Sequence, residues 1–205
     1  MKAIIFDMGG VLVDLDVEAC KDAFRKDLEF YEIDQILDAC HQTGVVGEME
    51  VGNIDEYAFR DYVIAHSRPG ITGEDVDHAL HKILVSIAPY KFDLLRKLSE
   101  KYDIYMLSNN NPIATKRAGQ MFREGGFTME DDFKKCYISY QMKMLKPSAE
   151  FYKAVIEDIA LPAEEMLFID DSQKNVDAAI DAGLPAVYYE PGTDLGELIA
   201  KHVEY

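Results

Sequence analysis

Six polar residues follow short apolar runs of this sequence, at the points where predicted strands end. They are Asp7, Ser108 with Asn109, Lys146, and the adjacent pair Asp170 and Asp171. In an open α/β sheet, ligands bind outside the carboxyl ends of the strands, so we expect these side chains to meet at one edge. A hydroxyl, an ammonium group and several carboxylates are the groups that phosphoryl transfer requires.

Phosphoryl transfer gives each of these groups its own task. One carboxylate would attack phosphorus, and the hydroxyl and the ammonium group would bind the remaining phosphoryl oxygens. Other carboxylates would hold Mg²⁺, because Asp170 and Asp171 side by side would repel each other without a cation. A second interpretation takes Asp171 and Ser172 as the N-cap of a helix over residues 173–182, and the two roles are compatible.

The elements that position these residues follow from the apolar pattern. Continuously apolar runs predict strands at residues 3–6, 104–107, 166–169 and 186–189, with a weaker strand at 136–139. The pattern between them is helical, which is typical of a parallel sheet covered on both faces. We therefore predict an α/β fold with a Rossmann-like parallel sheet of about five strands flanked by helices.

Residues 15–89 have a different pattern. Amphipathic helical stretches lie at 18–31, 34–40, 55–66 and 74–86, separated by glycines and by a turn at residues 68–70, and no stretch predicts a strand. A helical block of this length between the first two strands indicates an insertion. We predict an all-helical cap domain over residues 15–89, inserted into a catalytic core formed by residues 1–14 and 90–205.

The composition narrows the possible partners and the cellular location. The chain has 205 residues, with 21 Lys and Arg against 38 Asp and Glu, which gives a formal net charge of −17. Nucleic acids and anionic membranes require basic surface, so we expect neither as a partner. No run approaches the roughly 18 apolar residues of a membrane helix. Three separated cysteines without a CxxC pair suit a reducing compartment, so we expect a cytoplasmic protein, with its oligomeric state left open.

Four motifs give the sequence a family resemblance. In chain order they read IIFDMGGVLVD, MLSNN, KMLKPSAEFY and LFIDDSQKNVDAA, and they are distributed along the whole chain. The sequence resembles the haloacid dehalogenase superfamily, and its helical block lies where members with a C1-type cap carry theirs. Within the superfamily it is most similar to bacterial sugar-phosphate phosphatases of the glucose-1-phosphate type.

The resemblance implies a role for each residue that matches a motif. Asp7 matches the nucleophile that forms an aspartyl-phosphate, and Lys146 matches the lysine that pairs with this nucleophile and with the phosphoryl group. Ser108 matches the phosphate-binding hydroxyl, with Asn109 beside it. The implied partner is a small phosphorylated metabolite.

The resemblance also implies a Mg²⁺ site. Its ligands would be Asp7, the backbone carbonyl of Gly9, Asp170 and Asp171. Asn175 lies four residues beyond Asp171 and is therefore expected on the same helix face, where its amide would support the ligands or face solvent.

Gly9 is the departure from the family pattern. Most phosphatases of this superfamily have a second Asp two residues after the nucleophile, acting as general acid and then general base, a contribution of about 10²–10⁴-fold. Three replacements are open: a cap residue, a carboxylate just past the first strand, or a substrate that needs little help. Candidates of the first two kinds are His41, Glu48, Glu50, Asp14 and Asp16. We favour the third replacement, in the form of an anomeric phosphate with a comparatively acidic leaving hydroxyl.

The predicted function is Mg²⁺-dependent hydrolysis of a small phosphate monoester, and more specifically of a sugar phosphate. Because of Gly9, two other functions stay open. One is a metal-independent 2-haloacid dehalogenase, since the dehalogenases proper also lack that Asp. The other is a non-catalytic protein that binds a phosphorylated ligand. The Asp170–Asp171 pair favours a metal, and therefore favours the phosphatase.

Overall fold

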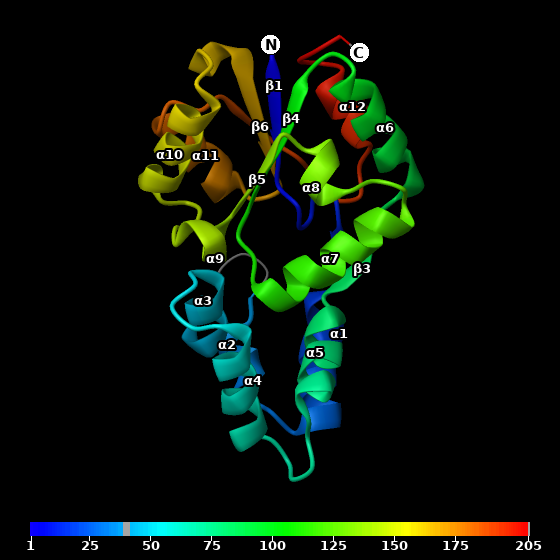
Figure 1. The fold of residues 1–205 in the computed structure, drawn as a ribbon, viewed down its shortest axis with the longest axis vertical. Coiled ribbons are helices and arrows are strands. Elements are labelled where there is room, and N and C mark those ends of the chain that lie inside the picture. Colours follow the sequence, from blue (N-terminus) through cyan, green and yellow to red (C-terminus); the bar gives the residue numbers. More distant parts are fainter. Residues whose placement is uncertain (39–41, 205) are drawn as a thin grey trace.

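A sheet of five parallel strands forms the centre of the protein, in a computed structural model that describes residues 1–38 and 42–204. The strands are β1 (Ala3–Phe6), β4 (Asp103–Ser108), β5 (Lys135–Ile138), β6 (Met166–Asp170) and β7 (Ala186–Tyr188). Their spatial order is β5-β4-β1-β6-β7 (Figure 1), so β1 lies between β4 and β6 in parallel register. The chain order reverses direction at β1, and such a switch point is where open α/β sheets bind ligands.

Both faces of the sheet are buried, which explains why the strands read as continuous apolar runs. Ile4 and Phe6 face one layer, formed by α6 (Pro89–Ser99), α7 (Pro112–Glu124) and α12 (Leu195–Ile199). Ala3 and Ile5 face the other, formed by α10 (Ala149–Ile159) and α11 (Gln173–Asp181). Short helices α8 (Met129–Asp132) and α9 (Ser139–Met142), and a 3-10 turn over Ala163–Glu165, complete the connections. The predicted α/β sheet is confirmed.

The helices between β1 and α6 gather at the end of the molecule away from both termini (Figure 1). They are α1 (Val17–Ala23), a π-helical turn over Phe24–Leu28, α2 (Ile33–Ile36), α3 (Gly44–Glu50), α4 (Glu56–Ala65) and α5 (Gly73–His81). They bury a hydrophobic cluster of their own, which includes Phe24, Phe30, Phe59 and Val76. We call residues 15–89 the helical insert; its status as a separate domain with these boundaries stays a prediction.

One expectation for the insert needs correction, because the region contains strand. Asp14–Leu15 (β2) and Leu84–Ser86 (β3) pair as a short antiparallel ribbon where the insert leaves the sheet. The predicted helix over 74–86 therefore ends at His81, since the residues that follow pair with β2. Helix α3 was not predicted, because Gly44 and Gly47 interrupt its pattern. In the described part of the chain, no helix has both the length and the apolar character needed to cross a membrane.

Candidate active site

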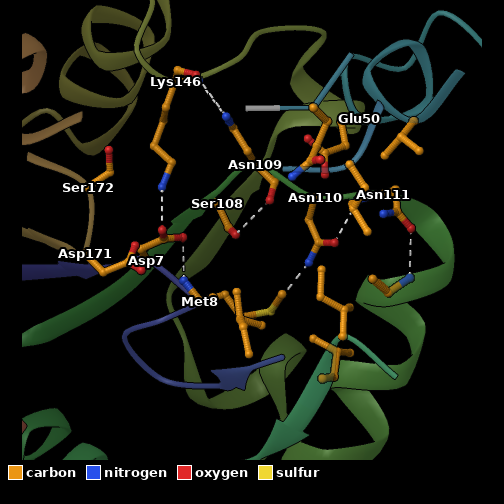
Figure 2. Close-up of a pocket in the computed structure, with 18 of the residues that line it drawn as sticks. Asp7, Met8, Glu50, Ser108, Asn109, Asn110, Asn111, Lys146, Asp171 and Ser172 are labelled. Carbon is orange, nitrogen blue, oxygen red and sulfur yellow. Dashed lines mark hydrogen bonds and ion pairs between the residues drawn. The ribbon is translucent and has the colours of Figure 1, made fainter. Parts of the chain in front are cut away.

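A pocket lies at the carboxyl ends of the central strands, between the sheet and the helical insert. The sheet side contributes most of the predicted site residues to it, among them Asp7, Ser108, Asn109, Lys146 and Asp171. The insert contributes side chains from its α2–α3 and α5–β3 segments, namely Leu37, Gln42, Val46, Glu50, Leu80 and Ile83. Figure 2 shows Asp7 and Asp171 on one side of this pocket and Glu50 on the other. The structure thus brings together polar groups from the ends of β1, β4 and β6 and from the loop after α9.

Lys146 links two of the carboxylates. Its Nζ lies 2.6 Å from Oδ2 of Asp170 and 2.9 Å from Oδ2 of Asp7. All three side chains are buried, with 2 % of Lys146, 0 % of Asp170 and 7 % of Asp7 exposed. Burial alone would lower the pKa of Lys146, but the carboxylates of Asp170 and Asp7 outweigh it and raise that pKa. The ammonium group therefore stays charged at any physiological pH.

Asp7, Asp170 and Asp171 form a carboxylate cluster that fits a divalent cation. Each offers an oxygen within 4.8 Å of the others, close enough to share one ion. Burial raises the pKa of Asp7 to about 7; the Lys146 ammonium opposes this shift, and the Asp170 and Asp171 carboxylates add to it. Burial and Asp170 likewise raise the pKa of Asp171 to about 6. The cluster thus has an excess of negative charge that a bound cation would neutralise, and hard oxygen ligands suit Mg²⁺.

Gly10 allows Asp171 to reach this cluster. Its φ of +72° is a conformation that favours glycine, and a Cβ at this position would overlap the Asp171 carboxylate. Gly9 also lines the pocket, and a Cβ there would lie 2.9 Å from Cδ1 of Leu15. The role of the Gly9 backbone carbonyl as a metal ligand stays a prediction.

Asp170 is held in place by its own network. Its Oδ1 accepts hydrogen bonds from the backbone N–H of Ser172 at 2.8 Å and from Nδ2 of Asn175 at 3.0 Å. The Tyr152 hydroxyl in turn donates to the Asn175 carbonyl at 3.0 Å. Asn175 therefore faces the carboxylates rather than solvent. Ser172 occupies the N-cap position of α11, but its side chain makes no capping hydrogen bond.

Ser108 and Asn109 lie at the end of β4, beside Lys146. The Ser108 side chain is buried, and among the residues that the structure describes its hydroxyl makes only a long contact of 3.4 Å with the Asn109 carbonyl, so it has capacity for a ligand. The Asn109 amide bonds both backbone groups of Lys146, at 2.9 Å and 2.8 Å. This side chain therefore positions the backbone of Lys146. The predicted phosphate-binding roles of both residues stay predictions.

The structure separates the candidates for the missing general acid. Asp16 accepts from Ala19 N and caps α1, and the Asp14 carboxylate contacts Nζ of Lys91 at 3.2 Å. Glu48 is exposed, and its carboxylate accepts from Asn53 at 2.8 Å. His41 lies outside the described residues. Glu50 is the candidate that the described structure places in the pocket.

Ser139 was not predicted as part of the site. It directly follows β5, so the signal that found the other residues, a polar side chain after a strand, also applied here. Its fully buried hydroxyl accepts from Asn110 N at 2.9 Å and donates to the Glu50 carbonyl at 2.6 Å. Ser139 therefore connects the sheet to helix α3.

Known proteins support the interpretation of this geometry. Residues 1–183 match the family described as haloacid dehalogenase-like hydrolase. The chain belongs to this family. It is 32 % identical over 195 residues to a D-ribitol-5-phosphate phosphatase of Bacteroides thetaiotaomicron, a match that covers 95 % of this chain and 94 % of the relative. The predicted resemblance and the predicted class of enzyme, a hydrolase of this family, are confirmed.

Two solved structures share the whole architecture. One is a haloacid dehalogenase family enzyme of B. thetaiotaomicron in complex with magnesium and inorganic phosphate, with 38 % identity, a TM-score of 0.89, and 97 % and 98 % of the two chains covered. The other is described as a predicted haloacid dehalogenase-like family hydrolase of Porphyromonas gingivalis, with 30 % identity, a TM-score of 0.89, and 100 % and 99 % covered. This confirms the fold for the entire described chain.

Proposed function

We propose that this hydrolase is a Mg²⁺-dependent phosphatase that cleaves a small phosphate monoester through an aspartyl-phosphate on Asp7. The observation that carries the proposal is the convergence of Asp7, Asp170, Asp171 and Lys146 at the carboxyl ends of β1, β6 and their neighbours, with the carboxylate oxygens within 4.8 Å of one another. The relative named as a phosphatase and the relative that holds magnesium and phosphate support it.

The residues divide the reaction among them. An Oδ of Asp7 attacks phosphorus, and the bond from phosphorus to the ester oxygen breaks. The Lys146 ammonium favours the carboxylate form of Asp7 and neutralises charge on the phosphoryl oxygens, while the Ser108 hydroxyl donates a hydrogen bond to one of them. Asp7, Asp170 and Asp171 would hold Mg²⁺, which would supply further positive charge to offset that of the phosphoryl group. Water then hydrolyses the aspartyl-phosphate and restores Asp7.

We propose a polyol or sugar phosphate as the substrate class, with the helical insert acting as a cap over it. The relative named for D-ribitol 5-phosphate acts on a phosphate of a primary alcohol, which is a poor leaving group. Such a substrate needs a proton donor, whereas the anomeric phosphate that we favoured from the sequence needs less help. A closed insert would also exclude water before the chemical step.

A phosphometabolite panel with and without Mg²⁺ tests this function. The expected result is phosphate release that stops with EDTA, and a phosphorylated Asp7 peptide in acid-quenched enzyme; Asp7→Asn should remove both. Halide release from 2-haloacids without metal would instead identify a dehalogenase. Binding of phosphate esters without turnover would identify a non-catalytic protein. Full activity of Asp7→Asn would contradict the proposed mechanism.

A further inference from the structure

Glu50 brings a carboxyl group of the helical insert into the pocket that contains Asp7. It is the last residue of α3 and is partly buried. The Asp7 carboxylate and the Lys146 ammonium are both near enough to influence its ionisation. In Figure 2, Glu50 lies across the pocket from Asp7. In an in-line displacement the leaving oxygen points away from the attacking oxygen, so the leaving group of a phosphate held by Asp7 faces the insert.

The backbone of Glu50 is fixed by the sheet side of the molecule. The Ser139 hydroxyl donates to the Glu50 carbonyl at 2.6 Å and accepts from Asn110 N at 2.9 Å. Gly52, two residues after Glu50, is held in the same way: its carbonyl accepts a hydrogen bond from Lys143 Nζ at 2.8 Å. Gly52 has φ +76°, and a Cβ there would overlap the backbone carbonyl of Tyr140, so the chain after α3 packs directly on α9. These contacts set where the Glu50 side chain begins.

The Glu50 carboxyl differs from the amide side chains of Gln42, Asn110 and Asn111, which also line the pocket. The Gln42 amide forms two hydrogen bonds with the backbone of Asp38: its Oε1 accepts from the Asp38 N–H, and its Nε2 donates to the Asp38 carbonyl. Asn110 bonds Met8 and the Asn111 backbone, and the Asn111 side chain caps α7. Within residues 1–38 and 42–204, no hydrogen bond or ion pair involves the Glu50 carboxyl. This carboxyl group is therefore available to a ligand.

The surroundings of Glu50 favour its protonated form. Burial raises the pKa of Glu50 to about 8, with the Lys146 ammonium opposing the shift and the Asp7 carboxylate adding to it. A carboxyl group that keeps its proton near neutral pH can act as an acid, as general acids do when burial tunes them towards the working pH.

We propose that Glu50 is the general acid and base of this hydrolase. It would take over the role of the Asp that most phosphatases of the family carry at the position of Gly9. The inference rests on the proposed phosphatase function. In the first step the bond between Asp7 Oδ and phosphorus forms, the bond from phosphorus to the ester oxygen breaks, and that oxygen takes the proton of the Glu50 carboxyl. In the second step the Glu50 carboxylate removes a proton from water, which attacks the aspartyl-phosphate. Phosphate leaves, and Asp7 and protonated Glu50 are restored.

Two substrates separate this role from a structural one. D-ribitol 5-phosphate releases an alkoxide that needs a proton, whereas p-nitrophenyl phosphate releases a nitrophenolate that does not. With Glu50→Gln, we expect kcat for D-ribitol 5-phosphate, or for the best alkyl phosphate of the panel, to fall about 10²–10⁴-fold. With p-nitrophenyl phosphate, the same variant should release one equivalent of nitrophenolate per active site at the rate of the unmodified enzyme. It should then stall as the aspartyl-phosphate, because the base for the second step is missing.

Glu48→Gln is the matched control, since Glu48 lies two residues earlier on α3 and is exposed. This substitution should change neither kcat for the alkyl phosphate nor the release of nitrophenolate from p-nitrophenyl phosphate. Gly9→Asp in the Glu50→Gln background should restore activity on the alkyl phosphate, because a Cβ at Gly9 meets only the end of the Leu15 side chain, which can move. Equal losses on both substrates, or none, would overturn the role of Glu50. Absence of Mg²⁺-dependent turnover in the unmodified protein would instead overturn the phosphatase function.

Discussion

The two sides of the pocket are built in opposite ways. On the sheet side, the central charged groups each have several partners: Lys146 contacts two carboxylates, and Asp170 accepts hydrogen bonds from Ser172 and Asn175. On the insert side, the Glu50 carboxyl has no such partner among the described residues, and only its backbone is held. The sheet side is therefore organised before a ligand arrives, whereas the insert side has one carboxyl group free to follow the ligand.

This difference matches what the two halves of a phosphate ester require. The phosphoryl group is the same in every substrate, so fixed charges at fixed distances serve it best. The alcohol differs from one substrate to another, and a proton donor on a short side chain can adapt to it. Four changes, from the largest expected effect to the smallest, test whether the two sides really differ in this way.

Lys146→Met should have the largest effect, because it leaves the carboxylates of Asp7 and Asp170 buried without their cation. Removing one partner of a buried ion pair costs about 3–5 kcal/mol, so the free energy of unfolding of the metal-free protein should fall by that amount. Mg²⁺ should recover part of the loss, but kcat should not recover. Urea unfolding with and without Mg²⁺ measures this. Lys153→Met, at an exposed position of α10, is the control and should change neither quantity.

A rise in pH should destabilise the metal-free protein. The pKa values of Asp171, Asp7 and Glu50 are raised to about 6, 7 and 8, so the folded state binds more protons than the unfolded state above about pH 4. The stability that these groups contribute at low pH is lost from about pH 4 upwards, at up to about 1.4 kcal/mol per pH unit for each group, until the pH passes the folded-state pKa of that group. Burial lowers the pKa of His81, which acts in the opposite direction but is a single group.

Thermal unfolding between pH 5 and 8.5 checks this expectation. With EDTA, Tm should fall across the range, and Mg²⁺ should raise Tm more at pH 8 than at pH 5. A Tm that stays level or rises with pH in EDTA would show that the pKa values of Asp7, Asp171 and Glu50 are not raised as described.

Asn175→Ala tests the support behind the carboxylate cluster. The variant removes the amide that donates to both oxygens of Asp170, at 3.0 Å and 3.2 Å. Groups of this kind typically contribute 10–100-fold to metal affinity, so Mg²⁺ binding measured by calorimetry should weaken by about that factor. Gln173→Ala, at an exposed position of the same helix, should leave the affinity unchanged.

Ser139→Ala should have the smallest effect and should act on the insert side alone. It leaves the Asn110 N–H and the Glu50 carbonyl without their shared partner, which should lower the free energy of unfolding by about 1 kcal/mol. The kcat for an alkyl phosphate should fall more than the nitrophenolate burst, because Glu50 loses its fixed position. Mg²⁺ affinity should stay the same. Ser99→Ala, at an exposed position, controls for the loss of a hydroxyl.

The sheet side was largely predictable from the sequence. Four strand ends follow directly from apolar runs that are buried on both faces, and parallel strands bring their carboxyl ends together. Even the weak strand predicted at 136–139 lies at Lys135–Ile138. The network of Asn109 was not predictable, because its partner is the backbone of Lys146, 37 residues away.

The insert side was not predictable to the same depth. Glu48 and Glu50 are both acidic residues of one short segment, and only the packing of α3 on Ser139 and α9 turns one towards the pocket and leaves the other in solvent. The ribbon formed by β2 and β3 was missed for a similar reason, since Leu84 and Val85 also fit the helical pattern before them. Tertiary contacts decide both cases. The predictions of a separate cap domain and of a cytoplasmic location stay predictions.

The hydrogen bond from Ser139 to residue 50 ends on a backbone carbonyl, which every amino acid possesses. The hydrogen bond that holds α3 in place therefore does not depend on the side chain at this position. Chemistry at residue 50 can be exchanged without rebuilding the architecture around it, whether by drift or by design. A basic or neutral side chain at position 50 would start from the same backbone position and would face the ester oxygen of the proposed substrate. Position 50 is thus a natural starting point for redirecting this enzyme towards other leaving groups.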